Sequence, residues 1–139
     1  MHLRHATRWE IQEYRREFEP QNAVLAARRA TETDLKRLDN ATNEFLSAVD
    51  DGNEAMEIAR LDTSIHVLIA EATHNEVRAS IMVGLAQATR RALEVPPRTA
   101  DGAAVLAQAG AEFLALVDAI RRGDATSAEA TMSQHLIGI

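Results

Sequence analysis

The sequence contains no cysteine and no long apolar run. The absence of cysteine excludes disulfides, thiolate metal sites and cysteine nucleophiles, so any metal site must use His, Asp or Glu. No apolar run approaches the roughly 18 residues of a membrane span, and the polar segment Met1–Glu10 is unlike a signal-peptide core. We therefore expect a soluble, cytoplasmic protein with no membrane partner.

Basic residues are outnumbered by acidic ones, 15 against 21, which gives a formal net charge of −6. Nucleic-acid affinity is largely electrostatic and depends on Lys and Arg. The arginines also occur in short pairs, such as Arg90-Arg91 and Arg121-Arg122, rather than in one long stripe. We expect this chain alone to bind DNA poorly.

Aromatic residues are scarce, at 4% of a chain that is 46% hydrophobic, so the core must be built mainly from Ala, Leu, Ile and Val. Small side chains of this kind suit closely approaching helices. The 139 residues are the length of one domain, which buries about two thirds of its unfolded surface. The composition predicts a single all-α domain over residues 1–139.

Apolar residues recur at spacings near three, four and seven, which predicts an antiparallel bundle of six or seven helices joined by short loops. The expected helices cover residues 7–29, 31 or 33 to 50, 53–73, 76–94, 103–122 and 125–136. Proline lacks an N–H and collides with the carbonyl four residues back, so we expect a kink or a break at Pro20, near the first turn of a second piece. Pro96 and Pro97 indicate a loop over 95–102.

Asp62 and His66 are the most informative polar residues of the chain. They are four residues apart, so they lie one above the other on the third expected helix, within its apolar face. A buried carboxylate must be paired, protonated or coordinated. A hydrogen bond between the two residues and a metal site both satisfy this requirement.

A second inward histidine favours the metal. His135 shares a face of the last expected helix with Ala128 and Met132, so it can meet the third helix in the core. Two imidazoles and a carboxylate suit a divalent transition metal that keeps open positions for water or a small carboxylate. His74, by contrast, is expected to be a polar residue at a helix end.

Arg15 lies on the same helical face as Ile11 and Phe18, so part of its side chain must point inward. A guanidinium in a cavity can clamp a carboxylate through two hydrogen bonds. A structural ion pair with Glu19 or another helix is the alternative. The sequence leaves both interpretations open.

Taken together, four ordered segments resemble the C-terminal domain of FadR-type regulators in the GntR family of transcription regulators. The segments are YRREFEPQNAVLAA at 14–27, LDTSIHVLIAEATHN at 61–75, VDAIRRGDA at 117–125 and MSQHL at 132–136. The resemblance implies a helical effector-binding and dimerisation domain that normally follows a winged helix-turn-helix domain, absent from this chain. The effectors of this family are often small organic acids.

Many members of the family hold a metal, such as zinc, nickel or manganese, with one Asp and three His. The resemblance assigns three of these places to Asp62, His66 and His135, while the fourth falls at Phe113, where the family usually has His. Loss of one imidazole lowers metal affinity and adds an apolar wall. Two outcomes follow: a three-ligand site completed by water, or a metal-free pocket in which His66 and His135 bind the effector directly.

The leading hypothesis is a regulatory domain, not an enzyme. It binds a small organic acid through Asp62, His66 and His135, together with Arg15, and acts as a homodimer that reaches DNA only through another domain. A metal-dependent helical-bundle enzyme is the first alternative, but the sequence shows no general base beside the open metal positions. A bundle used only for oligomerisation is the second.

Overall fold

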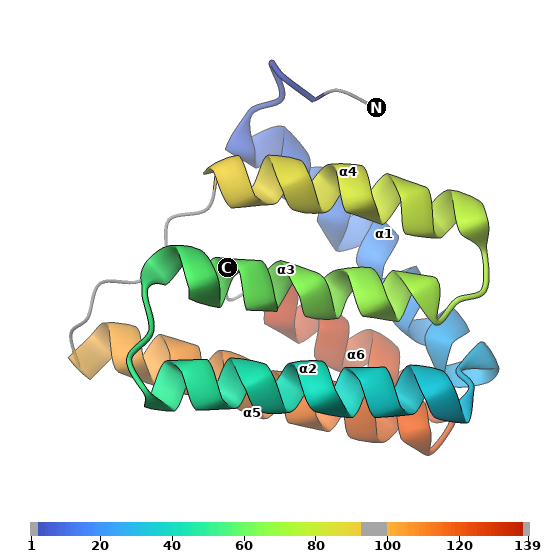
Figure 1. The fold of residues 1–139 in the computed structure, drawn as a ribbon. Coiled ribbons are helices and arrows are strands. Elements are labelled where there is room, and N and C mark those ends of the chain that lie inside the picture. The colour runs from blue at the N-terminus through green and yellow to red at the C-terminus, as the bar shows by residue number, and fades with distance from the viewer. Residues whose placement is uncertain (1–2, 93–99, 138–139) are drawn as a thin grey trace.

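The computed structural model describes residues 3–92 and 100–137, apart from the side chain of residue 92, as a bundle of six helices (Figure 1). The helices are α1 (Arg8–Arg29), α2 (Glu32–Asp50), α3 (Ala55–Glu71), α4 (Glu76–Ala92), α5 (Ala100–Arg121) and α6 (Ala125–Ile137). The described residues contain no strand. The predicted all-α class is confirmed, as is the lower of the two expected helix numbers.

Capping boxes define where α1 and α2 begin. At α1, the Thr7 hydroxyl accepts a hydrogen bond from the Glu10 backbone N–H at 3.1 Å, and the Glu10 carboxylate accepts from the Thr7 backbone N–H at 2.9 Å. Thr31 and Asp34 make the same exchange at the start of α2. Each box pairs N–H groups that have no partner inside the helix.

Helix α1 continues through Pro20, so the expected break and second piece are wrong. The lost hydrogen bond and the steric conflict of an interior proline cost about 3 kcal/mol. Packing outweighs this cost, because α1 contacts α3, α4, α5 and α6 and Pro20 itself is buried. Tertiary contacts therefore decide the conformation at this residue.

Helix α5 begins at Ala100, three residues before the expected start at Ala103. The rest of the loop predicted over 95–102, and the predicted end of the fourth helix, lie outside the described residues. Helix α5 is also long and apolar enough to cross a membrane, with a mean hydropathy of 1.6 over 18 residues. Core helices of soluble proteins meet the same criterion, so it assigns no membrane role.

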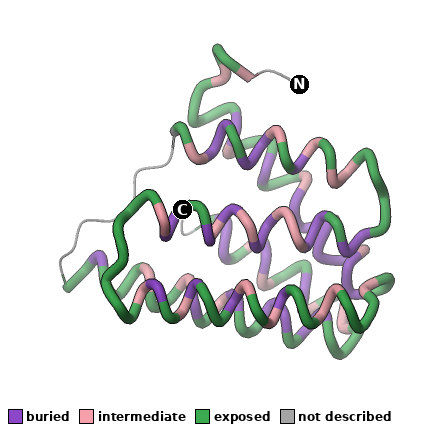
Figure 2. The backbone as a smooth tube through the Cα atoms, viewed as in Figure 1, coloured by how far each residue is buried: buried purple, intermediate pink, exposed green. Residues whose placement is uncertain are grey.

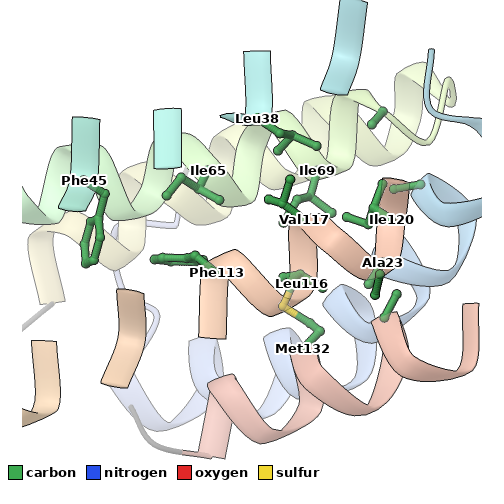
Figure 3. Close-up of a cluster of buried hydrophobic side chains, with 14 of the residues drawn as sticks. Ala23, Leu38, Phe45, Ile65, Ile69, Phe113, Leu116, Val117, Ile120 and Met132 are labelled. Atoms are coloured by element: carbon green, nitrogen blue, oxygen red, sulfur yellow. The ribbon is translucent and has the colours of Figure 1, made fainter. Parts of the chain in front are cut away.

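The helices pack around one main core with a smaller cluster at its side. Helices α2, α3 and α4 follow one another as antiparallel neighbours, α5 lies beside α2, and α1 and α6 pass behind them (Figure 1). Buried positions lie on the sides of the helices that face one another (Figure 2). In the main core, Phe113 of α5 packs edge-on against Phe45 of α2, with Ile65 of α3 nearby (Figure 3).

Candidate metal and effector site

Two histidines and an aspartate from α3 and α6 converge inside the bundle. Asp62, His66 and His135 each offer a ligand atom, and these atoms lie within 4.8 Å of one another. The two imidazole rings are stacked, with centroids 5.3 Å apart, and both are buried. Asp62 is 22% exposed, which makes it the most accessible of the three. The structure thus brings together the three residues to which the sequence assigned a metal.

Each imidazole is held by a carboxylate on its Nδ1 atom. His66 Nδ1 lies 2.5 Å from Glu19 Oε1, and His135 Nδ1 lies 2.9 Å from Glu112 Oε1. Ionised carboxylates only accept hydrogen bonds, so both Nδ1 atoms carry the proton and donate it. In the neutral tautomer this leaves the lone pair on Nε2, which is the arrangement found in histidines that bind metals.

Both Nε2 atoms are buried without a hydrogen-bond partner. His66 Nε2 lies 3.1 Å from Asp62 Oδ1, close enough for an ion pair, but the pair does not have the geometry of a hydrogen bond. When both rings are neutral, two nitrogen lone pairs and a carboxylate face one another with no donor between them. A cation in this position would satisfy all three, so these residues fit a divalent metal.

The local charges favour a proton on His66 when no metal is bound. Burial acts to lower the pKa of His66, but the carboxylates of Glu19 and Asp62 outweigh it and raise that pKa to about 9. Burial and the neighbouring charge of His66 lower the pKa of His135. The metal-free pair therefore keeps one extra proton, which a metal ion would have to displace.

Asp62 remains ionised in this setting. Burial acts to raise its pKa, but the close ion pair with His66, followed by the charge of His135, holds that pKa below the usual range. A carboxylate that stays ionised is a competent metal ligand at neutral pH.

Arg15 forms the ion pair that the sequence left as an alternative to a carboxylate clamp. Its Nε donates to Glu19 Oε2 at 2.5 Å, and its Nη2 lies 3.5 Å from His66 Nδ1. Burial acts to raise the pKa of Glu19, but His66 and Arg15 outweigh it and lower that pKa to about 2. Glu19 thus stays ionised between two cationic partners while fully buried.

Phe113, the position at which the sequence resemblance places a fourth ligand, lies beside the two histidines. The side chain is fully buried, and its ring centroid is 4.5 Å from that of His135 and 5.6 Å from that of His66. It closes one side of the centre with an apolar wall. In the part of the chain that the structure describes, the candidate ligand group therefore has three members.

Sequence reasoning missed the two carboxylates that orient the histidines. Glu19 was considered only as a partner of Arg15, although its place on the inward face of the helix was a usable signal. Glu112 was not singled out, and nothing in its spacing points to His135. His74 lies at the end of α3 as expected, and its Nε2 is 2.6 Å from Asp34 Oδ2.

Comparisons with known proteins connect this geometry with a family. Residues 10–138 match the FCD domain family. The galactonate operon transcriptional repressor of Escherichia coli (strain K12) is 34% identical over 120 residues, which are 86% of this chain and 50% of the repressor. A solved structure, Streptococcus agalactiae GntR, has the same fold, with a TM-score of 0.80 and 21% identity over 93% of this chain and 56% of that one. The chain thus spans about half the length of the relatives it matches.

Proposed function

The chain belongs to the FCD domain family of GntR-type transcription regulators, and on this premise we propose that it is an effector-sensing domain that binds a small organic acid. In this proposal the domain controls DNA binding by a separate domain in the other half of the regulator. Its relatives are about twice its length, which leaves room for such a partner domain. The proposed regulator is a cytoplasmic homodimer without catalytic activity.

The unpartnered Nε2 atoms of His66 and His135 beside the Asp62 carboxylate carry this proposal. Asp62, His66 and His135 would hold one divalent ion, with zinc, nickel and manganese as the candidates. A bound ion would supply a Lewis acid that attracts the carboxylate of the effector. Glu19 and Glu112 hold the two imidazoles in the tautomer that this role requires.

Arg15 adds positive charge next to the centre, because its guanidinium reaches both Glu19 and His66. The paired Glu19 carboxylate offsets this charge, so the bound ion would supply most of the attraction for an anionic effector, and Arg15 would act mainly by holding Glu19 in place against His66. The named relative controls a galactonate operon, so sugar acids are the first compounds to test.

A regulatory response requires that the effector bind one helix arrangement more tightly than another. The centre is suited to this because α3 and α6 provide its ligands, while α1 and α5 provide the carboxylates that orient them. An effector bound there contacts elements from both ends of the chain. A change in their relative positions is the signal we propose for the DNA-binding domain.

Metal analysis and melting experiments test this function. Protein purified without a histidine tag should contain about one equivalent of divalent metal, and metal-stripped protein should melt at a higher temperature after zinc, nickel or manganese is added. Asp62→Ala should abolish both effects, whereas Asp118→Ala, an exposed change on α5, should leave them intact. A sugar acid should then raise the melting temperature of the metal-loaded protein without being consumed.

The possible outcomes separate the alternatives. An undetectable metal content together with no response to added metal would overturn the metal centre. Turnover of the acid would favour an enzyme, and the absence of any stabilisation by acids would favour a bundle used only for oligomerisation.

A further inference from the structure

The number and kind of ligands at the centre bear on which metal it suits. Asp62, His66 and His135 offer one carboxylate and two imidazoles, and no fourth residue joins this group in the part of the chain that the structure describes. A structural zinc site uses four protein ligands, although catalytic zinc sites use three. Two His and one carboxylate with open positions are typical of non-haem iron(II). The choice between zinc and iron then depends on the geometry and surroundings of the centre.

The separation of two ligand atoms indicates the coordination geometry. Asp62 Oδ1 and His66 Nε2, one turn apart on α3, are separated by 3.1 Å. On bonds of about 2.1 Å, two ligands at right angles are about 3.0 Å apart, whereas two ligands of a tetrahedral ion are about 3.4 Å apart. The observed separation is closer to the right-angle value. An octahedral ion held by three protein ligands keeps three open positions, whereas a tetrahedral ion keeps one.

The side of the centre at Phe113 is apolar. Phe113 is fully buried beside the two histidines, and its ring centroid is 5.1 Å from that of Phe45, which is also fully buried. Ile65 lies nearby (Figure 3). These side chains offer no hydrogen bond to an anion, and burial of a charge against them is costly. An open position on this side therefore suits a small neutral ligand.

The buried charges around the centre also balance without an anionic ligand. Glu19 and Glu112 each accept a hydrogen bond from an imidazole, and Arg15 pairs with Glu19. Together with Asp62, these groups carry three negative charges and one positive charge, which a divalent ion brings to zero. A neutral ligand leaves this balance unchanged, so it binds without the desolvation cost of an added charge.

We infer that the centre holds iron(II) and that its open position beside Phe113 binds a small neutral diatomic ligand such as nitric oxide. This inference rests on the metal centre of the proposed function. The other open positions, on the more accessible Asp62 side, remain for the acid. The domain would then respond to a gas as well as to an acid, which the proposed function does not include.

Anaerobic titration of the metal-stripped protein with iron(II), followed by nitric oxide, tests this inference. Iron(II) should bind at about one equivalent in the wild type and in the exposed variant Asp118→Ala, but not in Asp62→Ala. Iron(II) has integer spin and gives no signal in conventional EPR, whereas its nitric oxide adduct has half-integer spin and gives a strong one. We expect this signal to appear in proportion to the bound iron.

Two variants of Phe113 test the position of the ligand. Phe113→His should bind iron(II) more tightly, but its imidazole occupies the proposed position and should weaken nitric oxide binding about tenfold. Phe113→Leu keeps this position open and apolar, so its iron should bind nitric oxide more tightly than the iron of Phe113→His. Equal affinities of the two variants for nitric oxide would overturn the position beside Phe113.

The remaining outcomes separate this inference from the proposed function. If the metal-stripped protein binds zinc but not iron(II), the iron centre is overturned and the proposed function stands. If iron(II) binds but nitric oxide produces no EPR signal, the diatomic ligand is overturned and the proposed function again stands. If no divalent metal binds, the metal centre is overturned in both.

Discussion

The imidazole rings of His66 and His135 lie stacked 5.3 Å apart, and each is held through Nδ1 by a glutamate from a different helix. This relationship leaves both Nε2 atoms beside Asp62 without a hydrogen-bond partner.

Glu112→Gln should weaken metal binding without unfolding the protein. The neutral amide is a poorer acceptor for the His135 N–H, so the imidazole becomes less basic and less well oriented, and partners of this kind contribute about 10- to 100-fold in metal affinity. Competition with a chromogenic chelator measures the change. Glu129→Gln on the exposed side of α6 is the matched control, and equal affinities for the two variants would contradict the role of Glu112.

Phe113→His should raise metal affinity, because it adds a third imidazole, as a fourth ligand, where an apolar ring now packs 4.5 Å from His135. The variant should be less stable than the wild type when no metal is bound, since the edge-on contact with Phe45 is lost. Zinc titration followed by melting gives both quantities. Phe113→Leu, which offers no ligand, should lose stability without gaining metal affinity. A similar gain in metal affinity in both variants would contradict the role of the added imidazole.

Glu19→Gln should destabilise the fold by about 3–5 kcal/mol, because it leaves the Arg15 guanidinium buried without its ionised partner. Urea unfolding of the metal-free protein measures the loss. The double variant Arg15→Met with Glu19→Leu removes both charges and should recover much of the stability. Arg15→Met and Glu19→Leu are also measured singly. If the stability lost in the double variant equals the sum of the losses in these two single variants, the two side chains are not coupled as described.

The Asp34 carboxylate should make stability depend on pH in the acidic range. Burial acts to raise its pKa, but hydrogen bonds from the Thr31 backbone and from His74 outweigh it and lower that pKa. Since the folded-state pKa is depressed, the stabilisation is fully present above the unfolded value of about 3.9 and is lost as the pH falls through the folded value.

Comparison of the wild type with Asp34→Asn isolates this contribution. The variant should be less stable by about 1 kcal/mol at neutral pH, because a neutral amide oxygen accepts more weakly than a carboxylate from the Thr31 N–H and from His74, and the difference should shrink in acid. Urea unfolding between pH 3 and 7 measures it. If the difference in unfolding free energy between the wild type and Asp34→Asn does not change with pH, the charge of Asp34 is not the source of the stabilisation.

The sequence was sufficient for the parts of the structure that depend on local pattern. Apolar periodicity predicted the helices, and helical spacing placed Asp62 and His66 on one inward face. The meeting of His135 with α3 was also predicted, because both faces had to enter the same core. These inferences need only the geometry of single helices and the existence of one bundle.

The features that the sequence predicted wrongly, or did not predict, depend on contacts between distant segments. Pro20 stays inside α1 because several helices pack against it, which no local rule anticipates. Glu112 reaches His135 from another helix, and the register of α5 against α6 decides whether the two meet. Such pairings depend on tertiary packing, so sequence spacing alone does not show them.

The centre draws its parts from four helices, with Glu19 on α1, Asp62 and His66 on α3, Glu112 on α5 and His135 on α6. No fragment that lacks one of these helices contains the complete arrangement. An ion held there would act as a crosslink between the beginning and the end of the chain, and partial unfolding at either end would release it. Metal retention would then report on the integrity of the four helices that build the centre.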